Sequence, residues 1–95
     1  MTGVSWNEEG LGDKEKVWAA LQRFQEMRES GEFCCLEIYS DYAYVWEINY
    51  AWAETPSATP HQRRGVPGGA WPTLDSAIEN AYTLWKRGDL PRPGD

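Results

Sequence analysis

The sequence predicts a two-layer α+β domain, in which an antiparallel sheet of about three strands carries two helices on one face. Residues 33–52 (FCCLEIYSDYAYVWEINYAW) are rich in aromatic and β-branched residues, which is typical of two strands joined by a tight turn. Amphipathic helical patterns lie before and after this hairpin, at residues 14–30 and 74–87. Because two strands alone make a weak sheet, we expect a third, short strand at an edge.

The length of 95 residues fits one domain, which we place at residues 13–88. Residues 1–12 contain three glycines and predict an irregular N-terminal arm, in which Trp6 either packs on the core or anchors a partner. Residues 89–95 contain two prolines and little to bury, so we expect a disordered tail.

The first helix has clear boundary signals. Asp13 is a good N-cap, Glu15 suits the first turn, and Gly31 follows the helix as a C-terminal signal. An apolar stripe at helical spacing predicts the buried face. The stripe consists of Val17, Leu21 and Phe24, flanked by Trp18, Ala20 and Met27.

Strand alternation divides the hairpin between two faces. A three-residue turn at 41–43 would place Leu36 and Ile38 beside Trp46 and Ile48 on an apolar inner face, whereas a two-residue turn would bury a glutamate there. We therefore expect the three-residue turn. The predicted outer face then carries Phe33, Cys35, Glu37, Tyr39, Val45 and Glu47. Cys34 would be an inert core thiol, and Cys35 an accessible one.

The segment at 53–70 contains three prolines and three glycines. Such a long segment without structure is uncommon in a compact domain. It is either a functional loop or the location of the third strand, for which residues 62–66 and 69–71 are the candidates.

The second helix begins after Thr73, an N-cap that follows Pro72, and ends at Gly88. Acidic residues lie early in it and basic residues late, which matches the helix dipole. Its apolar stripe consists of Leu74, Ala77, Ile78, Ala81, Leu84 and Trp85.

The charge of the chain is unevenly distributed. The net charge is −6, and residues 1–54 carry 11 acids and 4 bases. This acidity argues against general affinity for nucleic acid and suits a basic partner surface. Adjacent cysteines cannot readily pair with each other, and no signal peptide or membrane span is recognisable, so we expect a cytoplasmic protein.

No pattern for catalysis or metal binding is present. His61 is the single histidine, and an enzyme would require its pairing with Cys34 or Cys35 across the fold. The cysteine and histidine spacing does not match a zinc site, and the glycine-rich stretch 65–69 lacks the lysine of a phosphate loop. We therefore expect neither an enzyme nor a cofactor or metal.

Two features are candidates for binding a partner. The first is the outer sheet face, unless the N-terminal arm or the long loop covers it. The second is the basic cluster of His61, Arg63 and Arg64, which either holds an acidic partner or pairs with the acidic half of the chain. An open sheet edge also permits a homodimer.

The order of helix, three strands and helix is similar to the double-stranded RNA-binding domain. That family carries lysines at the start of its second helix, whereas residues 73–77 contain no lysine and one acid. The expected function is therefore a small non-enzymatic interaction module, such as a phage or bacterial accessory factor or inhibitor that docks on a protein. The alternatives are nucleic-acid binding through Arg63, Arg64, Lys86 and Arg87, or an acidic mimic of nucleic acid. The mimic would use Glu26, Glu29, Glu32, Glu37 and Glu47.

Overall fold

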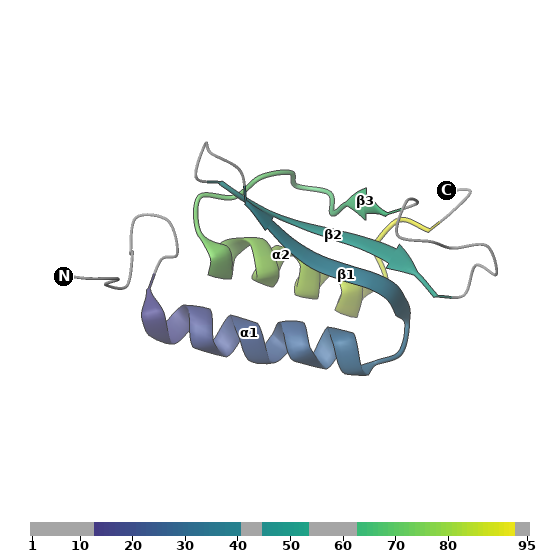
Figure 1. Cartoon of the computed structure of the whole chain (residues 1–95), viewed down its shortest axis with the longest axis horizontal. Coiled ribbons are helices and arrows are strands. Elements are labelled where there is room, and N and C mark those ends of the chain that lie inside the picture. Colours follow the sequence, from purple (N-terminus) through teal and green to yellow (C-terminus); the bar gives the residue numbers. More distant parts are fainter. Residues whose placement is uncertain (1–12, 41–44, 54–62, 93–95) are drawn as a thin grey trace.

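A computed structural model describes residues 13–40, 45–53 and 63–92, so the predicted N-terminal arm and His61 lie outside the described part. The elements follow the order α1 (Lys14–Glu29), β1 (Phe33–Ser40), β2 (Trp46–Trp52), β3 (Arg64–Gly65) and α2 (Leu74–Arg87). The strands form one antiparallel sheet in the order β1-β2-β3, and both helices lie against the same face (Figure 1). The predicted α+β fold is confirmed. Neither described helix has the length and apolar content needed to cross a bilayer.

Capping interactions set the helix bounds close to those predicted. The Asp13 carboxylate accepts hydrogen bonds from the Glu15 and Lys16 amides, at 2.9 and 3.1 Å, where α1 begins. The Thr73 hydroxyl accepts one from the Ser76 amide at 3.3 Å, where α2 begins. Gly88 ends α2 in the left-handed conformation with φ of 77°.

The hairpin has the predicted faces but a different register. Ile38 lies opposite Ile48 and Leu36 opposite Tyr50, so the apolar residues share the face that the helices cover. A three-residue turn would have placed Ile38 opposite Trp46. Instead Ser40 is the partner of Trp46, which leaves residues 41–45 to connect the strands. The turn itself, at 41–44, lies outside the described residues.

A β-bulge at the start of β1 overturns two predictions. Phe33 pairs with Trp52 but Cys35 pairs with Ala51, so Cys34 is an extra residue on this strand. The insertion reverses the alternation, and the Phe33 ring stacks on Trp52 in the core with centroids 4.7 Å apart. Phe33 is therefore not on the outer face as predicted. Cys34, predicted to be a core thiol, is exposed.

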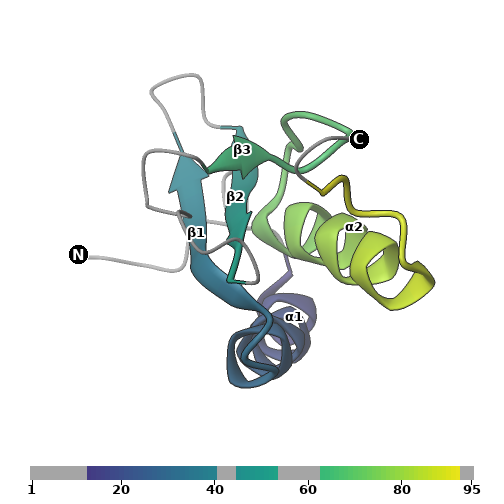
Figure 2. The same ribbon diagram turned by 90° about the vertical axis from the view of Figure 1, so that its right-hand side faces the viewer.

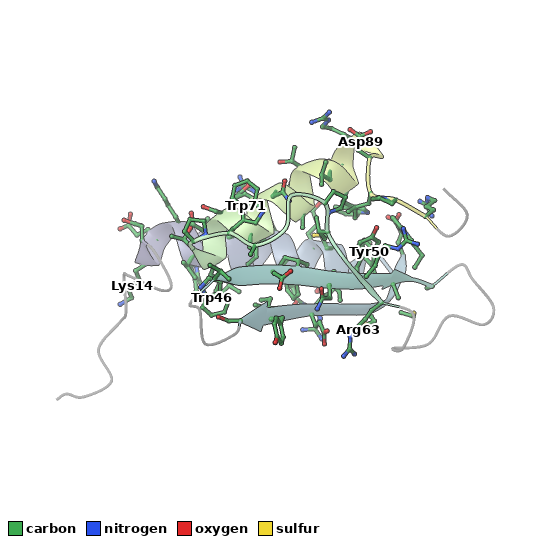
Figure 3. The ribbon with its side chains drawn as sticks, turned by 90° about the horizontal axis from the view of Figure 1, so that it is seen from above. Lys14, Trp46, Tyr50, Arg63, Trp71 and Asp89 are labelled. Atoms are coloured by element: carbon green, nitrogen blue, oxygen red, sulfur yellow. The ribbon has the colours of Figure 1, made fainter. Side chains whose placement is uncertain are left out.

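Both candidates for the third strand pair with β2. The pair Arg64–Gly65, within the first candidate, lies opposite Tyr50 and Asn49. In the second candidate, Trp71 exchanges two backbone hydrogen bonds with Trp46, at 2.7 and 2.8 Å, at one end of β2 (Figure 3). β2 is thus the central strand of the sheet.

The predicted disorder of residues 89–95 is wrong for the part that the structure describes. Leu90 is only 3% exposed and belongs to the core. The Pro91 carbonyl accepts hydrogen bonds from the Tyr50 hydroxyl at 2.6 Å and from the Trp52 indole at 2.8 Å. The Arg92 guanidinium lies 3.7 Å from the centre of the Trp52 ring. These contacts hold the chain after α2 against β2, and residues 93–95 lie outside the description.

Candidate functional site

The sheet face opposite the helices is the first candidate surface. We call it the outer sheet face, and no described helix lies against it (Figure 2). Tyr39 is its most accessible large apolar side chain, with 48% of its surface exposed. Of the predicted residues, the structure places Cys35, Glu37, Tyr39 and Glu47 on this face, together with Asn49, and Val45 directly precedes β2.

A polar cluster crosses this face. Glu37 on β1 forms an ion pair with Arg63, with 2.9 Å between carboxylate oxygen and guanidinium nitrogen. The Asn49 side chain on β2 donates a hydrogen bond to the same oxygen at 3.2 Å. Arg63 therefore pairs with the acidic half of the chain, one of the two predicted outcomes for the basic cluster. Arg64 is exposed on β3, where its partner in the ladder is Tyr50.

Glu47 differs from Glu37 in its surroundings. It is half-buried on β2 and lies opposite Tyr39 in the ladder. Within residues 13–40, 45–53 and 63–92, no ion pair or hydrogen bond satisfies its carboxylate. This surface therefore offers an exposed aromatic ring beside an unpaired carboxylate.

The predicted catalytic pair is not tested, because His61 lies outside the described residues. Of the two thiols, Cys34 is exposed and Cys35 is half-buried. In the described part of the chain, no group of three histidine, cysteine or carboxylate side chains is arranged to hold a metal ion.

The four cations proposed for nucleic-acid binding are largely engaged elsewhere. Arg63 pairs with Glu37, while Lys86 pairs with Glu26 and Arg87 with Asp89, each at 2.9 Å. A phosphate would have to compete with these carboxylates. The glutamates proposed to mimic nucleic acid do not share one surface. Glu26 is in the helix layer, whereas Glu37 is on the opposite face of the sheet.

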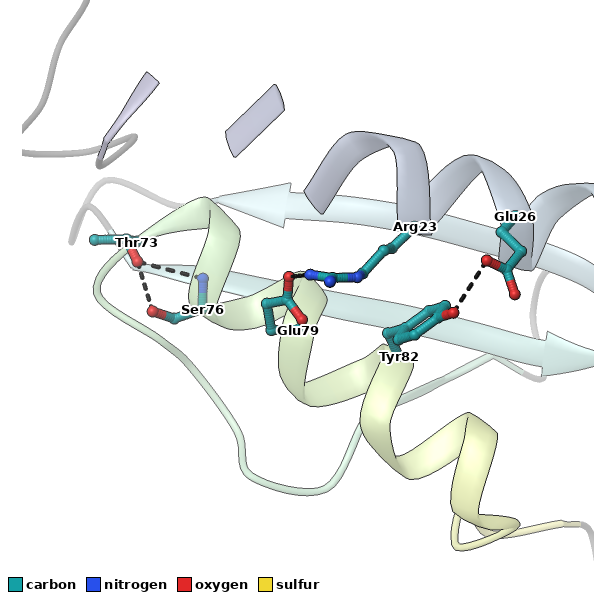
Figure 4. A network of polar contacts seen from close by, with 6 residues as sticks. All are labelled: Arg23, Glu26, Thr73, Ser76, Glu79 and Tyr82. Atoms are coloured by element: carbon teal, nitrogen blue, oxygen red, sulfur yellow. Dashed lines mark hydrogen bonds and ion pairs between the residues drawn. The ribbon is translucent and has the colours of Figure 1, made fainter. Parts of the chain in front are cut away.

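A polar network joins the exposed sides of the two helices. Arg23 pairs with Glu79, and the Tyr82 hydroxyl donates a hydrogen bond to Glu26 at 3.0 Å (Figure 4). The Lys86 ammonium and the Tyr82 hydroxyl together lower the pKa of Glu26, and Glu26 raises the pKa of Lys86. The network fixes α1 beside α2, so we assign it a structural role.

Sequence reasoning missed a second candidate surface, on α1. Leu21 was predicted to lie on the buried stripe, yet it is 36% exposed, and Trp18 is 67% exposed. The residues that α1 buries are Val17, Ala20, Phe24 and Met27. These four apolar residues recur at intervals of three and four and form a stripe whose centre lies away from Leu21. The sequence contained this pattern, so the exposure of Leu21 could have been predicted. Trp18 and Leu21 line a shallow hollow together with Lys14, Glu15 and Val17.

Comparisons with known proteins assign no relative: no protein-family model, no curated protein and no solved structure matches the chain.

Proposed function

We propose that the chain is a small non-enzymatic interaction module that docks on a partner protein through its outer sheet face. The observation that carries the proposal is that the exposed Tyr39 ring lies opposite the half-buried Glu47 carboxylate, which has no partner among the described residues. A large exposed aromatic residue is typical of the energetic centre of an interface.

The chemistry of this surface favours a basic partner. An arginine can form a bidentate pair with a carboxylate while its guanidinium plane stacks on a neighbouring aromatic ring. Glu47 and Tyr39 offer those two groups side by side, and the net charge of −6 favours approach of a basic surface. The Glu37–Arg63–Asn49 cluster holds the adjacent part of the face in a fixed arrangement.

A module of this size and acidity suits an accessory factor or inhibitor of bacterial or phage origin. Such a protein acts by covering a basic functional surface of its target, and it needs no catalytic group of its own. The ordered polar cluster would set the orientation in which the target is covered.

Affinity capture from a lysate of the source organism tests the proposal, followed by binding measurements on the purified pair. Tyr39→Ala should weaken binding by at least about tenfold, as expected for a central aromatic residue. Glu47→Gln should weaken it less, and its effect should shrink at high salt because screening weakens the charge pair.

Asp75→Asn is the matched control. It also neutralises a half-buried carboxylate, but one on α2, away from the outer sheet face. Equal losses for Glu47→Gln and Asp75→Asn would reduce the effect to net charge, and binding that is indifferent to Tyr39→Ala would contradict docking through this face.

A further inference from the structure

The exposed apolar side of α1 faces away from α2. Arg23 and Glu26 mark the side of α1 that contacts α2, through Glu79 and Tyr82. At roughly 100° per residue, Leu21 lies about 140° to 160° around the helix from these two residues, and Trp18 lies about 140° from Arg23 and about 80° from Glu26. We call this side, from Lys14 to Glu29, the α1 flank.

The free edge of the sheet lies on the same side of the molecule. β1 is an edge strand, and β2 is its one partner in the described sheet. In Figure 2, α2 lies to the right, whereas β1 and the side of α1 away from α2 lie to the left and below. An edge strand presents unpaired backbone groups that favour pairing with another chain. An apolar helix flank and an open strand edge therefore adjoin.

The charges on the α1 flank complement those of an antiparallel copy of the same helix. Its N-terminal end carries Lys14, and its C-terminal end carries Glu29. An antiparallel α1 from a second chain, centred between residues 21 and 22, places Lys14 of each chain opposite Glu29 of the other. Trp18 and Leu21 then lie between the two charged ends and are covered. A parallel copy in register would instead place like charges together.

We infer that the α1 flank and the free edge of β1 form the interface of a two-fold symmetric homodimer. One self-complementary patch on each chain is what a two-fold axis requires. The arrangement covers the most exposed tryptophan among the described residues and gives the open edge of β1 a neighbouring strand.

The homodimer goes beyond the proposed docking function and uses different residues. With the two β1 edges side by side, the two outer sheet faces point in the same direction. Both copies of Tyr39 then remain available to a partner. A dimer of this form would bind two adjacent basic sites, or a two-fold symmetric target, with greater avidity than one chain.

Sedimentation velocity on the full chain tests the interface, over protein concentrations from about 1 μM to about 500 μM, which span weak to moderate affinities. The wild-type chain should either shift from monomer to dimer as the concentration rises through this range, or be a dimer throughout it. Trp18→Ala should raise the dissociation constant at least about tenfold. Glu47→Gln changes the outer sheet face on β2, outside both the α1 flank and β1, and should leave the dimer unchanged. The two variants thus separate the failure of the dimer from failure of the docking function.

A charge exchange tests the antiparallel arrangement. Lys14→Glu should weaken the dimer about three- to tenfold by placing two carboxylates together. The double variant Lys14→Glu with Glu29→Lys recreates the pair and should restore wild-type affinity. The double variant also suits the helix dipole, so the fold should not suffer.

Two outcomes would overturn the inference. One is a chain that stays monomeric over the whole range. The other is a dimer whose affinity is insensitive both to Trp18→Ala and to the charge exchange.

Discussion

The two halves of the molecule use the same kinds of element in different ways. β2 buries Ile48, Tyr50, Ala51 and Trp52, whereas no residue of β1 is fully buried. α2 buries the core of its apolar stripe, whereas α1 leaves Trp18 and Leu21 accessible. The apolar residues of β2 and α2 are therefore mostly covered by the chain itself. In contrast, β1 and α1 keep exposed apolar side chains and an edge strand that can contact another molecule.

Strand position explains the difference. β2 has hydrogen-bonded neighbours on both sides, since β1 lies along one edge and β3 and Trp71 along the other. The segment after α2 also closes over β2, through the two hydrogen bonds accepted by Pro91. β1 has β2 alone. The sheet hydrogen bonds and the contacts of the C-terminal segment are therefore concentrated around β2, while both proposed interaction surfaces involve β1.

The largest expected effect comes from truncating one apolar residue in each half. Ile78 is fully buried on α2, so Ile78→Ala should lower the free energy of unfolding by about 2–5 kcal/mol. Trp18→Ala removes a larger side chain but one that is mostly exposed, so it should cost less than about 1 kcal/mol. Urea denaturation of both variants, at a concentration where the chain is monomeric, measures the difference. Similar losses of unfolding free energy for the two variants would contradict the contrast between the buried side chain of Ile78 and the exposed side chain of Trp18.

Two glycines with positive φ give a second, smaller contrast. A Cβ on Gly68 would lie 2.8 Å from the Asn80 amide nitrogen, and φ there is 108°. The same Asn80 side chain donates a hydrogen bond to the Pro67 carbonyl at 2.7 Å, which holds the loop against α2. Gly68→Ala should therefore cost about 1–3 kcal/mol or more, because steric conflict adds to backbone strain.

Gly31, between α1 and β1, is the matched control. Its φ of 76° is also strained for alanine, but no atom lies within 4 Å of the added Cβ. Gly31→Ala should cost about 1–2 kcal/mol, from the left-handed backbone alone. A larger loss at Gly31 than at Gly68, measured by the same denaturation, would contradict the tight packing assigned to the β2–α2 half.

Local signals made the helices and the sheet faces predictable. Asp13 and Thr73 satisfy amides within three residues of themselves, so their caps can be inferred from the sequence alone. The faces of the hairpin follow from alternation, which holds wherever a strand is regular. The fold class required nothing beyond these patterns.

Features that depend on distant partners were not predictable. The bulge at Cys34 allows Phe33 to stack on Trp52, and no residue near Cys34 in the sequence signals it. Leu90 lies in a proline-containing segment with few apolar residues, which predicted disorder. It nevertheless packs on the core, at a position that exists only once the rest of the fold has formed. For the candidate surface, the sequence indicated Glu37, Tyr39 and Glu47. The ion pair of Glu37 with Arg63, which leaves Glu47 without a partner among the described residues, depends on where the fold brings the residue before β3.

The smallest expected effect concerns the polar network between the helices, where the two halves meet. Lys86 and Tyr82 lower the pKa of Glu26 below its ordinary value of 4.5, so ionised Glu26 stabilises the fold. That contribution is complete above 4.5 and is lost as the pH falls through the lowered folded value. The pKa of Lys86 is raised above 10.5, so its contribution is complete below that value and is lost at higher pH.

Glu26→Gln should therefore be less stable than wild type at neutral pH by a small amount, because these groups are exposed and screened by salt. The difference in melting temperature should shrink toward about pH 3 and in concentrated salt. Lys86→Gln should remove only part of this pH dependence, because the Tyr82 hydroxyl still lowers the pKa of Glu26, and the double variant should lose no more of it than Glu26→Gln alone. A Glu26→Gln difference that is the same at acid and neutral pH would show that the charge of Glu26 does not help to hold the two halves together.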